Sequence, residues 1–402
     1  MSVQSPRDAS DALDAIRAAL AVRTPLEIVG RGSRRAFGRP METAARLDLS
    51  ALAGVRIYEP AELVLTAGPA TPLPDLEALL AANGQQLAFE PPDLGPLWGV
   101  GEGAGSLGGA LSVGLGGPRR PFAGAPRDHF LGFKGVNGFG EPFAAGGRVV
   151  KNVTGYDLPK LMAGAFGVLA VLTEVTVKVL PAPAETDTLA VAGLSPRAAF
   201  AFLRQATETA PAVTGAAFLP APAAGRTPGA PFGPRATTLL RLDGFGPAVE
   251  AAGAALLDGL PPGAEAMTLD PAESTRLWRA VGGAWAFADL AAPVWRLSIP
   301  PASALEVGHA LNRAGLELFY FDWAGGLIWA CGPDTPDGGA EAIRAPLPPG
   351  AHATLVRGSE ALRADIAPFQ PLAPGLMALQ RRLKGRFDPA GIFNPRRMYG
   401  EF

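Results

Sequence analysis

The sequence predicts a protein of the α+β class. Short runs of β-forming residues such as RLDLS, VRIY and LVLTAG stand among helical patterns without a regular alternation of strand and helix. Val175, Val177 and Val179 fall on one face of a strand and the polar residues between them on the other, which is the period of a half-buried strand. With 402 residues, 48% of them apolar, the chain is long enough to bury a large core and to divide into two or three domains.

The first elements can be read in order. An amphipathic helix opens the chain with Ser10 as its expected N-cap, and a buried strand follows at Leu26 to Val29. A second helix is expected from about residue 72 to 83, with Gly84 at its C′ position. Residues 90–147 are rich in glycine and proline and are expected to be mostly loop, ending in a strand–turn–strand unit at RDHFLGFKGVNGFGEPF.

The proline- and alanine-rich segment LPAPAETD predicts the first domain boundary. Beyond it, Ser195 and Pro196 form an N-cap and N1 pair for a helix to about Thr209, TTLLRLDGF and VWRLSIP have the pattern of strands, and LELFYFDWAGGLIWACG that of a hairpin around Gly325 and Gly326. A last helix in LMALQRRLKGRF ends in two proline turns. We therefore expect domains at 1–182 and 183–375, and a segment at 376–402 that returns to the first domain.

Composition excludes several classes of protein. A formal net charge of −2 and the lack of a recognisable motif argue against nucleic-acid binding. The single cysteine, Cys331, rules out an internal disulfide, a cysteine-ligated iron–sulfur cluster and a CxxC redox site within this chain. Acidic residues interrupt the N-terminus where a signal peptide needs an apolar run, and the longest uncharged apolar run, residues 161–173, is shorter than the ~20 residues of a membrane span. A cytoplasmic location is expected.

Two glycine-rich motifs are candidates for binding a phosphate group. GRGSRRAFG offers small residues, backbone N–H groups and arginines, which suit an anion, although a polar surface turn would have the same composition. The residues Gly103 to Gly108 match GxGxxG, but prolines precede them where a nicotinamide-binding fold needs a strand. No GxxxxGK[ST] motif occurs, so a P-loop is excluded.

Four segments, in this order, resemble the FAD-binding domain of the vanillyl-alcohol oxidase class, also called the p-cresol methylhydroxylase (PCMH) class. They are GRGSRRAFG, GSLGGALSVGLGGPRR, MAGAFGVLAVLTEVTVKVLP and LKGRFDPAGIFNPRRMY. The resemblance covers roughly residues 20–182 and 376–402. It implies an FAD-binding domain of two α+β subdomains, an α+β cap domain, and a C-terminal segment that packs back on the FAD domain.

The resemblance also assigns residues to the cofactor. The first loop lacks His and Cys, so we expect the FAD to be bound non-covalently. The segment from Gly146 to Pro181 is expected to fold along it, with glycines that let the backbone approach closely. The residues implied are Arg31, Gly32, Ser33, Arg34, Arg35, Gly105, Ser106, Leu107, Gly108, Gly109, Gly155, Tyr156, Gly164, Gly167 and Asn394.

A closer resemblance is carried by GPRRPFAGAPRDHFLG and GRVVKNVTGYDLPKLMAGAFG, which look like the E subunits of bacterial glycolate oxidase. It implies an FAD-binding subunit of a complex that oxidises glycolate to glyoxylate, with a flavin-containing D subunit, an iron–sulfur F subunit, and an association with the inner membrane only through these partners. Substrate chemistry is expected mainly on the D subunit. The alternatives are a self-sufficient FAD-dependent 2-hydroxy-acid oxidoreductase, with Tyr156 or His129 as catalytic groups, and a non-catalytic scaffold with the same fold.

The sequence does not identify a catalytic base. Oxidation of a 2-hydroxy acid requires a base for the hydroxyl proton and a cation for the carboxylate. His129, His309 and His352 are isolated from one another and lack the spacing of a metal site, so no metal is expected.

Seven arginines are candidates for binding a carboxylate, the flavin phosphates or a partner subunit. Four of them suit a carboxylate but are expected at the surface or at an interface: Arg241, Arg276, Arg279 and Arg296. Three others, on the loop 116–128, are expected to contact a partner subunit, the flavin phosphates or solvent: Arg119, Arg120 and Arg127.

Overall fold

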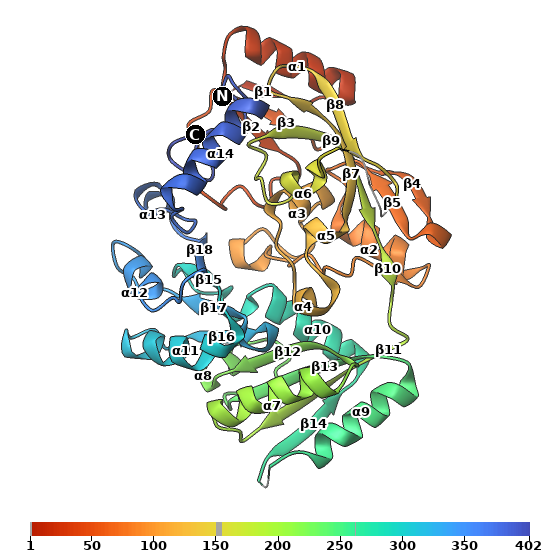
Figure 1. The fold of residues 1–402 in the computed structure, drawn as a ribbon, viewed down its shortest axis with the longest axis vertical. Helices are drawn as coiled ribbons and strands as arrows, with labels where there is room; N and C mark the ends of the chain where they lie inside the picture. Colours follow the sequence, from red (N-terminus) through yellow and green to blue (C-terminus); the bar gives the residue numbers. More distant parts are fainter. Residues whose placement is uncertain (1, 150–154, 262) are drawn as a thin grey trace.

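The computed structural model describes residues 2–149, 155–261 and 263–402. Figure 1 shows two sheet-based parts, with the start of the chain in the upper part, the middle in the lower part, and the C-terminal helix back beside the N-terminus. We call these the first part (residues 2–182), the central part (183–373) and the C-terminal segment (374–402). Among the described residues, no helix is both long and apolar enough to cross a membrane.

A small parallel sheet begins the first part. Its strands are β1 (Ser2–Gln4), β3 (Ala45–Asp48) and β2 (Leu26–Val29), in that order, and α1 (Ala9–Ala21) packs on it through Ile16. The N-cap of α1 is Asp8 and not the expected Ser10, because the Asp8 carboxylate accepts the N–H of Asp11 at 2.9 Å.

The second sheet of the first part is antiparallel. Its order is β4 (Val55–Glu59), β5 (Val64–Ala67), β9 (Ala170–Lys178), β7 (Phe130–Asn137) and β8 (Pro142–Gly146). Val175 and Val177 of β9 and Val179 just after it are fully buried as expected. Thr176 is buried too, with its hydroxyl 2.8 Å from that of Thr66. The strand is therefore covered on both faces at this point.

Short helices and turns complete the first part, several of them inside the region expected to be mostly loop. The helices are α2 (Leu73–Ala81), α3 (Leu107–Val113), α4 (Arg120–Ala123), α5 (Pro126–His129) and α6 (Leu158–Met162), with 3₁₀ turns η1 (Pro60–Glu62) and η2 (Pro96–Trp98). A short antiparallel pair of β6 (Gln85–Gln86) and β10 (Leu180–Pro181) leads to the central part.

The central part is one eight-stranded antiparallel sheet. Its order is β14 (Glu265–Leu269), β11 (Glu185–Ala192), β13 (Thr237–Gly244), β12 (Val213–Leu219), β16 (Phe319–Asp322), β17 (Leu327–Cys331), β15 (Val294–Ser298) and β18 (His352–Arg357). The expected hairpin is confirmed, since β16 pairs with β17 across the 3₁₀ turn η5 (Trp323–Gly325).

Helices cover one face of this sheet, which we call the outer face. The predicted N-cap Ser195 is confirmed for α7 (Pro196–Thr209), and α9 (Gly246–Asp258) and α11 (Ala304–Arg313) lie beside it. The remaining elements are α8 (Ala221–Ala224), α10 (Pro271–Gly282), α12 (Ala340–Arg344), α13 (Glu360–Asp365), η3 (Trp285–Phe287) and η4 (Pro301–Ser303).

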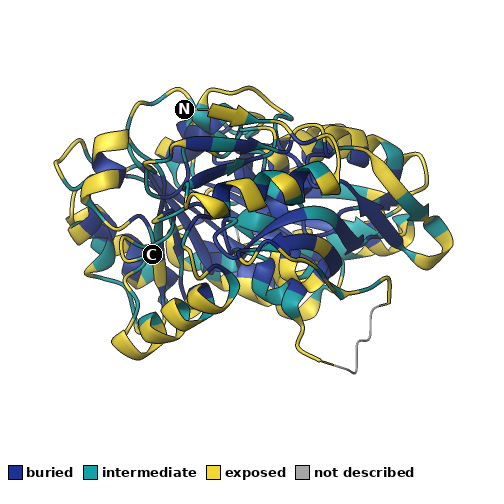
Figure 2. Ribbon diagram, turned by 90° about the horizontal axis from the view of Figure 1, so that it is seen from above, coloured by how far each residue is buried: buried dark blue, intermediate teal, exposed yellow. Residues whose placement is uncertain are grey.

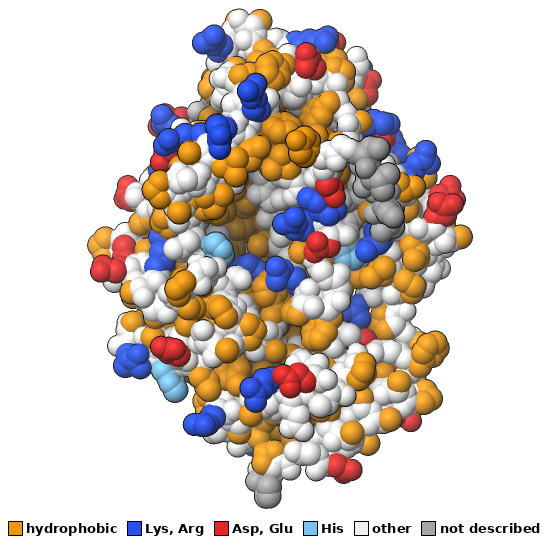
Figure 3. Space-filling view, viewed as in Figure 1, with side chains coloured by type: hydrophobic (Ala, Val, Ile, Leu, Met, Phe, Trp, Pro, Cys, Tyr) orange, Lys and Arg blue, Asp and Glu red, His pale blue; other side chains and the backbone are white. Residues whose placement is uncertain are grey.

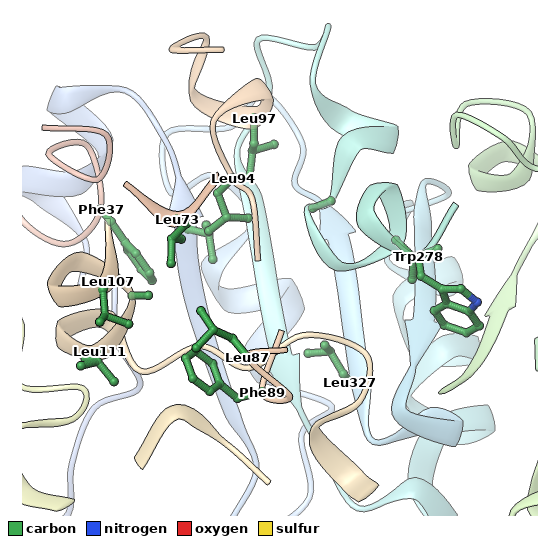
Figure 4. Close-up of a cluster of buried hydrophobic side chains, with 14 of the residues drawn as sticks. Phe37, Leu73, Leu87, Phe89, Leu94, Leu97, Leu107, Leu111, Trp278 and Leu327 are labelled. Carbon is green, nitrogen blue, oxygen red and sulfur yellow. The ribbon is translucent and has the colours of Figure 1, made fainter. Parts of the chain in front are cut away.

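The other face of the sheet, which we call the inner face, packs against the first part. One continuous core contains side chains from both, and Figure 4 shows Leu87 and Phe89 of the first part beside Leu327 of the central part. Figure 2 likewise shows buried strands through the middle of the molecule with exposed helices around them. The two parts therefore share a core.

Buried charges also join the two parts. The Arg241 guanidinium on β13 donates to both carboxylate oxygens of Glu90, at 2.7 and 3.0 Å, and Arg119 forms an ion pair with Asp243. We call these four residues the ionic clamp. The expectation that Arg241 lies at the surface is wrong, because a carboxylate 151 residues earlier in the chain pairs with it in the interior. Arg119 is likewise neither solvated nor free for a partner subunit.

The C-terminal helix α14 (Pro374–Phe387) returns to the first part. Its only buried residue is Lys384, whose ammonium donates to the carbonyl oxygens of Val168 (2.7 Å) and Phe393 (2.9 Å) and to the Asp388 carboxylate (2.6 Å). Because each of these acceptors is satisfied by one buried cation, Lys384 fixes the last segment against the loop before β9.

Candidate functional site

A pocket that is partly open to solvent lies between the first part and the C-terminal segment. Four segments far apart in the sequence form its wall: the turn after β2, the start of α3, the loop that enters β9, and the chain after α14. The predicted site residues that line it are Arg31, Gly32, Ser33, Arg34, Arg35, Ser106, Gly108, Gly109, Gly167 and Asn394.

Arg34 is the unusual residue of this pocket. Its Nη1 atom is buried and has no hydrogen-bond partner among the described residues. The guanidinium lies against the second glycine loop, where a Cβ added at Gly109 would come within 2.9 Å of Nη1. Burial lowers the pKa of Arg34 to about 10, opposed by the charge of Asp93. A buried cation without a partner is costly, so the pocket has the chemistry of a site for an anionic group.

The two neighbouring arginines are engaged differently. Arg35 forms an ion pair with Glu27, its Nε 2.6 Å from Oε1, and Arg46 contacts the same carboxylate at 3.1 Å. Arg31 is exposed and its Nε donates to the carbonyl of Ala104 at 3.4 Å. Of the three arginines that the motif offers, only Arg34 keeps an unpaired buried donor.

Arg397 is a pocket residue that the sequence did not single out. Its Nη2 donates to the carbonyl of Arg34 at 2.8 Å, while its Nε is buried without a partner, and burial lowers its pKa to about 10. The basic C-terminal run in which it lies was the only signal that could have pointed to it, through contact with a phosphate. Arg397 adds a second cation to the pocket.

Asn394 closes the wall of the pocket. Its Oδ1 accepts the N–H of Ile28 on β2 at 2.8 Å, and its Nδ2 donates to the carbonyl of Phe166 at 2.8 Å. It thereby joins the strand before the first glycine loop to the loop before β9. The role of Asn394 in the structure is to hold two pocket walls at a fixed separation.

The second glycine loop differs from the expectation that it offers free N–H donors. The N–H of Leu107 donates to Thr71 O at 3.0 Å, that of Gly108 to Pro69 O at 2.7 Å, and that of Gly109 to the N-cap hydroxyl of Ser106 at 3.3 Å. A Cβ added at Gly108 would lie 2.7 Å from Pro69 O. Glycine is therefore required at 108 by packing within the chain, and not by approach to a cofactor.

In the first glycine loop the backbone donors are free. Among the described residues, the N–H groups of Gly32, Ser33 and Arg34 have no backbone partner, and Gly32 has a φ of +77°. A φ in this range favours glycine. The turn after β2 thus supplies the unpaired donors that a diphosphate accepts.

Five predicted residues do not line the pocket. The side chain of Tyr156 is 90% exposed, beside Gly155; Leu107 is fully buried in the core; and the N–H of Gly164 donates to Leu111 O at 3.0 Å. Gly105 borders the guanidinium of Arg34 from outside the wall. Residues 150–154 of the segment expected to fold along the cofactor lie outside the described residues.

His129 is a packed side chain. It is fully buried, its Nε2 lies 2.7 Å from Ala123 O, and its ring is 5.4 Å from that of Phe89. Burial lowers its pKa, so the ring is held neutral within the core. Among the described residues, no group of three or more His, Cys, Asp or Glu side chains is arranged to hold a metal ion.

Matches to known proteins indicate the family to which this chain belongs. A family model described as an FAD binding domain matches residues 2–146. The p-cresol methylhydroxylase structure with substrate bound superposes with a TM-score of 0.70 at 14% identity, covering 100% of this chain and 89% of that one. The fold and the pocket therefore define an FAD-binding protein of the PCMH type, in the class of FAD-dependent oxidoreductases, and the expected α+β fold is confirmed.

Two proteins similar in sequence identify the family within this class. The chain is 34% identical over 390 residues to glycolate oxidase subunit GlcE of Escherichia coli, covering 97% of both chains. It is 37% identical over 84 residues to glycolate oxidase subunit GlcD of Bacillus subtilis, covering 21% of this chain and 18% of that one. The chain belongs to the GlcE family of glycolate oxidase subunits.

Proposed function

We propose that this chain is the FAD-binding subunit of a glycolate oxidase complex, which oxidises glycolate to glyoxylate and passes the electrons on through partner subunits. The observation that carries the proposal is the unpartnered guanidinium of Arg34 in a pocket with free backbone donors, in a chain similar to GlcE over nearly its whole length. The partners are a D subunit and an iron–sulfur F subunit. We propose a cytoplasmic complex that meets the inner membrane only through these partners.

Within the chain, we propose domains at 1–182 and 183–375, with residues 376–402 as a segment of the first domain. Arg34 and Arg397 neutralise the diphosphate of FAD, and the N–H groups of the first glycine loop donate to its oxygens. Bound FAD supplies an acceptor for a hydride. Of the other predicted residues, those that line the pocket shape its wall: Arg31, Arg35, Ser106, Gly108, Gly109, Gly167 and Asn394. For the predicted residues outside the wall, contact with bound FAD stays a prediction: Gly105, Leu107, Gly155, Tyr156 and Gly164.

Binding is proposed to be non-covalent, since the first glycine loop has neither His nor Cys, and both His129 and Cys331 lie outside the pocket. Substrate chemistry is assigned mainly to the D subunit, because the described residues of the pocket wall include no carboxylate or histidine that could act as a base.

The test measures flavin in the purified chain. We expect oxidised-flavin absorption bands in the native protein and their complete transfer to the supernatant after acid precipitation. A yellow pellet would contradict non-covalent binding, and colourless protein in both fractions, alone and with partners, would favour a scaffold.

A matched pair of glycine variants tests the location. A Cβ at Gly30 would lie 3.5 Å from Ser106 Oγ, which is ordinary contact, whereas one at Gly108 would clash with Pro69. Gly30→Val should therefore fold with a normal melting temperature and lose flavin, and Gly108→Val should lose stability even without flavin.

The division of labour is tested by dye-linked glycolate oxidation. We expect no turnover by the isolated subunit and activity after reconstitution with its partners. Robust turnover by the isolated chain that His129→Ala abolishes would support the self-sufficient enzyme instead.

A further inference from the structure

Two arginines lie over one tryptophan at the junction of the first and central parts. The Cζ atom of Arg120 is 4.6 Å from the ring centroid of Trp323, and that of Arg296 is 4.8 Å from the same centroid. Arg120 comes from α4 of the first part and Arg296 from β15 of the central part. Stacking on an indole stabilises each cation, but it places two like charges close together.

The sheet register puts further polar groups beside Arg296. Arg296 pairs directly with Trp329 on β17, and Trp329 pairs with Tyr320 on β16, so the three side chains form one row on the inner face. Asp322 is two residues after Tyr320 on the same face, and immediately precedes Trp323.

Several polar atoms of this group have no partner. Among the described residues, Nε of Arg296, Nε1 of Trp329 and Oδ2 of Asp322 are buried without a hydrogen bond, although Trp329 is 1% exposed and Asp322 fully buried. No described carboxylate is within ion-pair distance of Arg296, and the same holds for Arg120 in the part of the chain that the structure covers. Unsatisfied buried donors are rare in folded proteins and point to a missing acceptor.

The charges of the group favour an added anion. Burial and the nearby charge of Arg120 lower the pKa of Arg296 to about 10, against the opposing effect of Asp322 and Tyr320. Burial also raises the pKa of Asp322 to about 7, so near neutrality its carboxyl carries only part of a negative charge against the two cations. A bound anion would relieve the repulsion between the two arginines.

The group is reachable and lies close to the FAD pocket along the chain. The side chain of Arg120 is exposed, and the Trp323 Nε1 donates to Gly117 O at 3.0 Å. Gly117 follows α3, whose first turn and last residue line the pocket. Figure 3 shows that the molecular surface is hollowed where the upper and lower parts meet, with basic side chains beside apolar ones.

We propose that Arg120, Arg296 and Trp323, with Trp329 and Asp322, form a binding site for the carboxylate of a small organic acid in this chain itself. A carboxylate matches the planar fork of a guanidinium and accepts from the unpaired Nε of Arg296 and Nε1 of Trp329. The Asp322 carboxyl, when protonated, donates to a hydroxyl or oxo oxygen beside that carboxylate. The ligands of this site are therefore 2-hydroxy or 2-oxo acids. The choice of this ligand class rests on the proposed function.

The experiment is a calorimetric titration of the full-length chain, flavin-loaded, with glycolate and with glyoxylate. We expect saturable binding of at least one of them, with no heat from ethylene glycol, the neutral analogue of glycolate. Arg120→Gln and Arg296→Gln should each raise Kd about ten-fold or more. Arg204→Gln, which removes an exposed charge from α7 on the outer face, is the matched control and should bind as the unaltered chain does.

Each other outcome overturns the site. Lack of saturable binding by the unaltered chain would overturn the site. An unchanged Kd in the Arg120 variant would overturn it too, as would binding of sulfate as tightly as the organic acids. Because Arg120 is exposed, its variant is expected to fold even if the Arg296 variant does not, so the first variant alone decides the question.

The result is separable from the proposed function. If the reconstituted complex oxidises glycolate but the Arg120 variant binds and turns over as before, this inference fails and the function stands. If the chain binds small acids through the two arginines but no complex oxidises glycolate, the function fails and the site stands.

Discussion

Replacing Arg34 with glutamine should have opposite effects on stability and on cofactor affinity. Without FAD, the buried guanidinium costs free energy, since its pKa falls from 12.5 to about 10 and each pKa unit is worth about 1.4 kcal/mol. The cost is therefore about 3.5 kcal/mol at most, and it is smaller in practice because the side chain is only half-buried. The flavin-free variant should melt at the same temperature as the unaltered protein or a few degrees higher.

With FAD, the sign reverses. A hydrogen bond from a charged donor contributes about 1.5–3 kcal/mol, which corresponds to a loss of about 10- to 150-fold in affinity when it is removed. The assay is a titration of flavin-free protein with FAD, followed by differential scanning calorimetry of each form. Lys134→Gln, which removes an exposed cation from β7, is the control and should change neither quantity.

Two outcomes would refute this reasoning. If the Arg34 variant binds FAD within two-fold of the unaltered protein, the guanidinium does not face the diphosphate. If the flavin-free variant melts several degrees lower, Arg34 has a structural role that its lack of partners hides.

Three further predictions concern stability. Arg241→Met should lower the free energy of unfolding by at most about 3–5 kcal/mol in a denaturant titration, because Glu90, whose side chain is 26% exposed, loses its bidentate partner. The double variant with Glu90→Leu should recover part of that loss. Asp322→Asn should stabilise the protein increasingly as pH rises from 4 to 7, by up to about 4 kcal/mol. The reason is that the pKa of Asp322 is about 7 in the folded state and 3.8 in the unfolded state, so the unaltered protein loses stability as pH rises through this range. A difference in melting temperature that does not depend on pH would contradict this prediction. Lys384→Met should destabilise by a similar amount to Arg241→Met, since it strands the buried carboxylate of Asp388, and an unchanged melting temperature would show that the contact is dispensable.

Features encoded by neighbouring residues were predictable from the sequence. The strand Leu26–Val29 and the N-cap Ser195 follow from patterns within a few residues, and both are confirmed. The N-cap of the first helix was missed by two positions, because Asp8 and Ser10 are both good caps and only the geometry decides which side chain reaches a free N–H.

Features that depend on distant residues were not predictable. The motif GRGSRRAFG offers three arginines. Only the fold shows that Arg35 forms an ion pair with Glu27, while Nη1 of Arg34 has no hydrogen-bond partner among the described residues. Arg241 has nothing in its neighbourhood to mark it as buried, because its partner Glu90 lies in the other part of the molecule. From a single sequence, each arginine is expected to have the exposure that is average for this residue type. The ion pair that buries Arg241 is a tertiary contact, which the residues near it in sequence do not indicate.

The fixing of the pocket wall by Asn394 and Arg397 bears on how the protein is made. Asn394 joins β2 to the loop before β9, and its partners Ile28 and Phe166 are synthesised 366 and 228 residues earlier. A nascent chain therefore carries both glycine loops long before the wall between them can close. The wall can therefore close only after synthesis has passed these two residues, and a stop codon at position 394 would spare nearly all of the core while removing both of them.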